Sequence, residues 1–243
     1  MARVLVLSGG PDHAHDYETL GTTLTSIVRD DGHEIVGLFD DPDAAAERLR
    51  DGDVDVFVVN ALRWRMQGEA YDPWRDRWAY TTPDSTRDAI TGFVAAGGGL
   101  VGNHTASICF DDWPEWGDVL GGAWAWGRSW HPPIGPVTVE MTVGVTAHDE
   151  RADAGAHPVV SGLPARFVLA DEVYGDLDLR PGIEPLAHAR RSPDDAPQPL
   201  VWTHRYGAGR VVYDGLGHDE RSLNDPVHRR LICNAVRWVS GDR

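Results

Sequence analysis

The chain has 243 residues, 42% of them hydrophobic and ten of them tryptophan, enough for the core of one large α/β domain or two small ones. No uncharged apolar run approaches the ~18 residues of a membrane span, so a membrane partner is not expected. The formal net charge of −16 repels phosphate backbones, so nucleic acid is not expected either.

The first hundred residues predict alternating strands and helices. The apolar run at 3–9 predicts a first strand, and because no small-residue cleavage site follows it, we expect a cytoplasmic protein. Residues 17–31 predict a helix with Leu20, Leu24 and Ile27 on one face. Further strands are predicted over 33–39, 54–60 and 100–103, and further helices over 42–51 and 84–96. Their apolar, β-branched runs are typical of parallel strands covered on both faces, and a tryptophan-rich insertion at 61–83 interrupts the alternation.

From residue 111 onward, short strands replace this alternation. A helix is predicted over 111–122, with Pro114 in its first turn and Gly121 beyond its end. Strands are predicted over 136–141, 166–177, 199–206 and 210–219, the last two joined by a glycine turn. A closing helix follows Asp225, with a predicted buried stripe of Val227, Leu231, Ala235 and Trp238. No linker separates two halves, so residues 1–243 are predicted to form a single domain.

Polar side chains collect where the predicted strands end. Four strand ends carry such residues: His13 and His15, then Asn60, then Asn103 and His104, and finally His218 and Asp219. Ligands of open parallel sheets bind outside the carboxyl ends of the strands, so we expect these side chains to share a site. Each residue also has a purely structural interpretation, such as Asp219 capping a turn.

The sequence lacks the motifs of several common classes of enzyme. Cys109 has no flanking glycines for a sharp nucleophile turn, and Cys233 lies inside the closing helix, so both are expected to be reduced packing residues. There is no G-x-S-x-G motif, no phosphate-binding loop and no dinucleotide fingerprint. Histidine with carboxylate remains, which indicates proton transfer or a divalent metal, although no compact metal motif is present.

An ordered set of motifs resembles the trehalose-utilisation (ThuA-like) family. The motifs are GGGLVGNHTAS at 97–107, DWPEWGDVLGG at 112–122, HPP at 131–133, HPVVSGLP at 157–164, DEVY at 171–174 and YGAGRVVYDGLGHD at 206–219. That family is similar in fold to class I glutamine amidotransferases but lacks their catalytic cysteine. The resemblance therefore implies a flavodoxin-like three-layer α/β sandwich with a mostly parallel central sheet. It also implies that His104 lies close to the turn where the amidotransferase nucleophile would be.

The resemblance further implies an enzyme of carbohydrate catabolism acting on a sugar or keto-sugar derivative. Its catalytic residues would be His104, Glu172 and His218. Substrate contacts would come from the remaining candidates: His15, Asn103, His131, Asp171, Asp219, Trp130 and Trp64. No cofactor follows from the sequence: one alternative is zinc or a similar divalent ion on His15, His104, His218 and Glu172, and the other is a metal-free acid–base pair.

One stretch departs from the family pattern. Between Gly122 and His131 the chain carries Trp124, Trp126 and Trp130, where we expect a less aromatic segment. These tryptophans are a candidate stacking platform for sugar rings, whereas core packing or a contact between copies in a homo-oligomer is the alternative that we favour. The second function class is a non-catalytic sugar-binding or regulatory module on the same fold.

Overall fold

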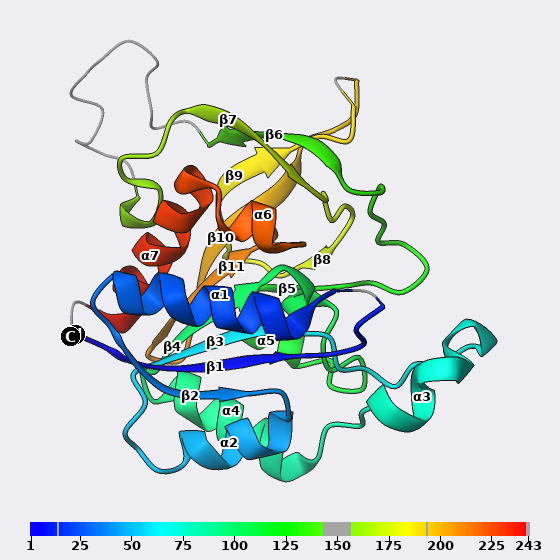
Figure 1. Cartoon of the computed structure of the whole chain (residues 1–243), viewed down its shortest axis with the longest axis vertical. Helices are drawn as coiled ribbons and strands as arrows, with labels where there is room; N and C mark the ends of the chain where they lie inside the picture. Colours follow the sequence, from blue (N-terminus) through cyan, green and yellow to red (C-terminus); the bar gives the residue numbers. More distant parts are fainter. Residues whose placement is uncertain (14, 143–156, 193, 242–243) are drawn as a thin grey trace.

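The computed structural model describes residues 1–13, 15–142, 157–192 and 194–241. Within these ranges a nine-stranded sheet runs through the molecule in the order β2-β1-β3-β4-β11-β10-β9-β6-β7 (Figure 1). The parallel half consists of β2 (Glu34–Phe39), β1 (Arg3–Gly9), β3 (Val56–Ala61), β4 (Gly99–Asn103) and β11 (Gly209–Asp214). The antiparallel half consists of β10 (Gln198–Tyr206), β9 (Glu184–Ala189), β6 (Gly135–Met141) and β7 (Arg166–Asp171). Because two antiparallel steps restore the direction, β9 and β7 again point the same way as the parallel strands.

Helices cover both faces of the parallel half. On one face lie α1 (Tyr17–Asp30) and α7 (Pro226–Ser240), and on the other α2 (Pro42–Leu49), α4 (Asp84–Ala95) and α5 (Trp116–Leu120) (Figure 1). Side chains alternate along β1 accordingly: Val4 and Val6 pack with α1 and α7, whereas Leu5 and Leu7 pack with α2, α4 and α5. This arrangement confirms the predicted flavodoxin-like α/β sandwich.

The short elements lie in the connections. They are η1 (Glu69–Tyr71), α3 (Asp72–Trp78), η2 (His104–Ser107), β5 (Gly122–Ala123), η3 (Pro158–Val160), β8 (Asp178–Leu179) and α6 (Glu220–Leu223). Helix α3 belongs to the tryptophan-rich insertion and projects from the body of the molecule (Figure 1). No helix in the described ranges is long and apolar enough to cross a membrane.

Three predicted elements were wrong by several residues at one end. Helix α5 begins at Trp116, so Pro114 precedes it, although Gly121 does end it in the left-handed conformation with φ 87°. Strand β7 stops at Asp171, whose carboxylate accepts the amide of Gly217 in the loop after β11. Strand β11 likewise ends at Asp214, and the residues up to His218 form a loop.

The predicted buried stripe of α7 was only half correct. Leu231 and Ala235 are buried, but Val227 and Trp238 are only partly buried. Polar residues occupy part of the inner face instead, because His228 and Asn234 hydrogen-bond with neighbouring elements. Strand β9 and helix α6 were not predicted, since neither carries a strong periodic pattern in the sequence.

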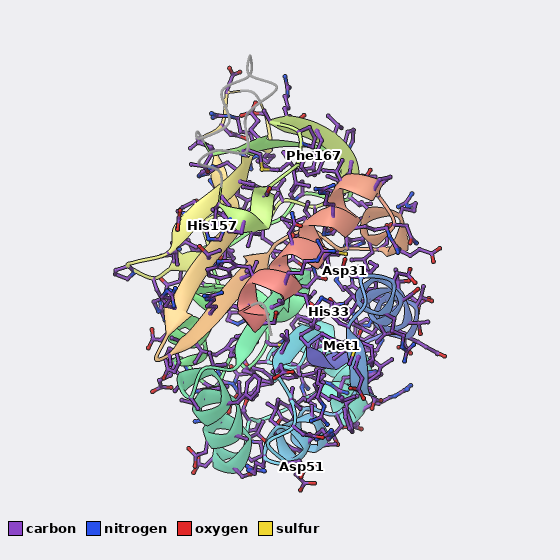
Figure 2. All side chains as sticks on the ribbon, turned by 90° about the vertical axis from the view of Figure 1, so that its left-hand side faces the viewer. Met1, Asp31, His33, Asp51, His157 and Phe167 are labelled. Atoms are coloured by element: carbon purple, nitrogen blue, oxygen red, sulfur yellow. The ribbon has the colours of Figure 1, made fainter. Side chains whose placement is uncertain are left out.

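At the amino edge of the sheet, the turn between α1 and β2 contacts both the start of the chain and the last helix. The backbone amide of Ala2 donates to His33 Nδ1 at 3.1 Å, and Arg237 of α7 pairs with Asp31. Figure 2 shows Asp31 and His33 beside Met1 at this edge.

A buried ion pair joins β11 to α7. His228 is fully buried, with Nε2 2.8 Å from the Asp214 carboxylate and Nδ1 2.9 Å from the Ser222 carbonyl oxygen. Since both ring nitrogens face acceptors, the ring is an imidazolium that donates twice. Burial opposes this charge, but the neighbouring Asp214 outweighs it and raises the pKa of His228 above its usual 6.5.

We predict that Asp214→Asn lowers the free energy of unfolding by about 3–5 kcal/mol, because it leaves a buried charge unpaired. In the wild type, the contribution of His228 is complete below its unfolded-state pKa of 6.5 and is lost as the pH rises through the raised folded-state value. Urea unfolding between about pH 6 and pH 9 measures both effects. A wild-type profile that stays flat across this range would contradict the ionised pair.

Candidate functional site

Three histidines meet at the carboxyl edge of the sheet. His15 lies between β1 and α1, His104 follows β4, and His218 lies between β11 and α6. The ring centroids of His15 are 5.0 Å from His104 and 4.5 Å from His218, and one nitrogen of each ring lies within 4.8 Å of the others. Glu172, directly after β7, joins them, with Oε2 3.7 Å from His104 Nε2 and 3.3 Å from His218 Nδ1. The predicted convergence of these side chains is confirmed, while their roles stay predictions.

Backbone carbonyl groups set the orientation of two of the rings. His15 Nδ1 is 3.0 Å from the carbonyl oxygen of His218, and His104 Nδ1 is 3.0 Å from that of Gly215. A carbonyl oxygen only accepts, so each Nδ1 carries the proton and donates it. Nε2 of both rings therefore carries the lone pair and acts as an acceptor.

These two histidines are neutral at neutral pH. Burial lowers the pKa of His15 to about 3, assisted by the neighbouring His104 and His218. Burial also lowers the pKa of His104 to about 4. A neutral imidazole is the form that accepts a proton or binds a metal.

Glu172 is a buried carboxylate with one unpartnered oxygen. Its Oε1 lies 3.1 Å from His131 Nδ1, whereas Oε2 has no hydrogen bond and the geometry of its His218 contact falls short of one. Burial opposes ionisation, but contacts with His131, His218 and His104 outweigh it and lower the pKa of Glu172. The carboxylate raises the pKa of His131 and, against the effect of burial, of His218.

Tyr174, which was not among the predicted site residues, completes the site. Its hydroxyl donates to His104 Nε2 at 3.0 Å, and burial raises the pKa of the phenol far above its usual value. The signal was present, because Tyr174 closes the DEVY motif that carries Glu172.

His104 is the first residue of the turn η2, directly after β4. Its φ of 45° lies in the left-handed region, which costs a residue other than glycine about 1–3 kcal/mol. The Tyr213 hydroxyl holds the turn by donating to the His104 carbonyl at 2.8 Å. Close packing requires Gly102 just before it, since a Cβ there would lie 2.5 Å from Leu120. The turn therefore fixes the buried His104 imidazole at the carboxyl edge of the sheet.

Three residues that were predicted to contact substrate instead form hydrogen bonds or ion pairs within the protein. The carboxylate of Asp171 accepts from the amides of Gly217 at 2.8 Å and His218 at 3.3 Å. Asn103 donates to the Leu216 carbonyl at 2.9 Å. Asp219 caps α6 and pairs with Arg221, which is the structural interpretation raised for it above. All three act on the loop and helix that carry His218.

A pocket of about 300 Å³ opens beside the histidines. Its lining residues are His13, His15, Leu62, Trp64, Tyr71, Ile108, Trp124, Trp126, His131, Glu172, Tyr174 and His218. The predicted Trp64 and His131 belong to it, and sequence reasoning did not assign Tyr71, Leu62 or Ile108. Trp130 lies elsewhere: its indole donates to Asp176 at 2.6 Å and its ring packs under Arg191.

Neither cysteine carries a thiolate. Cys109 Sγ donates to the Ala61 carbonyl at 2.8 Å, and burial raises its pKa to about 12. Burial also raises the pKa of Cys233 to about 11. Nucleophilic catalysis needs the thiolate, so neither residue supplies it at neutral pH.

Known structures share this architecture. A ThuA-like protein from Parabacteroides merdae is 18% identical with a TM-score of 0.76, over 98% of this chain and 90% of that one. A ThuA-like protein from Bacteroides uniformis is 23% identical with a TM-score of 0.68 over the same shares. A cytoplasmic protein from Salmonella typhimurium is 13% identical with a TM-score of 0.59, over 98% of this chain and 99% of its own. At these identities the likeness shows the fold alone.

The sequence comparison is more specific. No curated protein matches the chain. The family model for ThuA, described as trehalose utilisation, matches residues 3–239, which is nearly the whole chain. The motifs, the fold and this match agree, and the chain belongs to the ThuA trehalose-utilisation family.

Proposed function

We propose that the chain is a metal-assisted enzyme that acts on a sugar or keto-sugar derivative by moving a proton. Membership of the trehalose-utilisation family indicates a role in sugar metabolism. One observation carries the chemistry: His15, His104 and His218 gather around a point beside an unpartnered, ionised Glu172 oxygen. Such a set is suited to a divalent cation.

The three histidines would hold a zinc-like ion after their rings move closer together. Three nitrogens bound to one zinc at about 2.1 Å lie roughly 3.4–3.6 Å from one another. The three histidine nitrogens lie within 4.8 Å, so the widest spacing would close by up to about 1.3 Å, a movement within the reach of side-chain rotation. The Tyr174 hydroxyl would release His104 Nε2, and the carbonyl bonds on Nδ1 already orient His15 and His104 as metal ligands require.

A bound ion would supply polarisation of a substrate carbonyl or activation of water. The chain itself supplies the proton path. Glu172 Oε2 faces the centre of the site, while Oε1 contacts His131, which is 45% exposed at the pocket wall and has a raised pKa. Glu172 can therefore accept a proton from substrate and His131 can exchange it with solvent, while Trp64 and Trp124 offer flat faces to a sugar ring.

We place this activity in the cytoplasm. Both cysteines are free, which suits a reducing compartment. The similar Salmonella typhimurium structure is described as a cytoplasmic protein, which supports the same location.

The metal interpretation predicts that protein prepared without a histidine tag binds Zn²⁺ in calorimetry. His15→Ala removes one imidazole and should weaken binding by about 100-fold or more. His13→Ala is the matched control, because His13 lines the same pocket but stacks on Trp74 outside the three-histidine group. Equal affinities in both variants, or no binding in the wild type, would leave a metal-free acid–base site.

The proton-transfer interpretation predicts that the protein speeds deuterium exchange at the carbon next to the carbonyl of a 3-keto sugar. NMR in heavy water measures the rate. Glu172→Gln should slow it by about 10²–10⁴-fold, whereas Cys109→Ala with Cys233→Ala should match the wild type. Binding of the sugar without faster exchange would instead favour a non-catalytic sugar-binding module.

A further inference from the structure

A second pocket adjoins the first. It also measures about 300 Å³ and is lined by Trp64, Arg65, Gln67, Asp111 and Trp126. Trp64 and Trp126 line both pockets, so the two share a wall. We propose that this outer pocket binds the second ring of a neutral di- or oligosaccharide whose first ring lies beside the histidines. This inference rests on the proposed action on sugars and specifies the size of the substrate.

One of the shared tryptophans has a property that a ligand would explain. Trp126 is 49% exposed, an unusual state for so large an apolar side chain beside a pocket. Trp64, which is only 4% exposed, forms a buried part of the shared wall. The apolar face of a sugar ring would pack on Trp126 and remove its surface from water.

The polar side of the outer pocket suits hydroxyl groups more than an anion. Arg65 Nε lies 3.2 Å from Asp111 Oδ2, and Arg65 Nη2 donates to the Asp111 carbonyl at 3.3 Å. The other carboxylate oxygen accepts the Arg65 amide at 2.8 Å. The charge of Arg65 is therefore balanced, its guanidinium is held in place, and Gln67 adds a donor and an acceptor. Paired donors and acceptors without net charge are complementary to sugar hydroxyls, whereas a phosphate would need the unbalanced guanidinium.

Calorimetry with glucose, trehalose, maltose and cellobiose tests the subsite, since the three disaccharides differ in linkage. At least one disaccharide should bind about tenfold tighter than glucose, the effect of a modest set of added contacts. The measured quantity is the ratio of the Kd for glucose to the Kd for the disaccharide. Trp126→Ala and, independently, Gln67→Ala should each bring this ratio down toward one. Leu38→Ala is the control, because Leu38 is similarly exposed at 45% but lies on β2, and it should keep the wild-type ratio.

The outcomes separate this inference from the proposed function. If glucose binds as tightly as every disaccharide, or no sugar binds, the outer subsite is wrong even where Zn²⁺ binding and deuterium exchange are found. If the ratio behaves as expected without any exchange activity, the subsite stands and the enzymatic proposal fails. A Trp126→Ala variant that changes the sedimentation mass but not the ratio would assign Trp126 to a subunit contact and overturn the subsite.

Discussion

The geometry of the candidate site depends on the backbone of one turn, Gly215–His218. The carbonyl groups at its two ends orient His104 and His15, and the same turn carries the third histidine. Asp171 holds the turn by accepting its Gly217 and His218 amides. Because carbonyl oxygens only accept, the turn also selects which ring nitrogen is protonated, and therefore which one faces the ligand.

A polar network beneath the turn links the site to the stability of the fold. Ser222 lies between the Asp171 carboxylate and the His228 ring, and His228 in turn pairs with Asp214 at the end of β11. The network therefore connects β7, α6, α7 and β11 through buried hydrogen bonds. Buried polar groups of this kind are costly when any one partner is lost, so the elements that carry the site keep a single arrangement.

Charge and burial divide the roles among the ionisable groups. Burial keeps His15 and His104 neutral, while the surrounding histidines keep Glu172 ionised despite its burial. One pocket thus holds neutral lone pairs and a negative oxygen side by side, a combination suited to a cation or to proton transfer. The left-handed conformation at His104 places a strained backbone position directly at the candidate site.

The sequence by itself determined the alternating α/β order, the carboxyl edge as the candidate site, and the meeting of His104, His218 and Glu172. These follow from periodicity and from strand ends, which are local properties, and from motifs shared with a family. Only the tertiary structure decided that Trp124 and Trp126 line the pocket while Trp130 packs under Arg191, and that Asp171 and Asn103 hold a loop. It also decided the tautomers, because they depend on carbonyl groups of residues more than a hundred positions away in the chain. The type of a residue limits which groups it can bind. The path of the loops decides which of those groups it meets, and the local periodicity of the sequence does not encode that path.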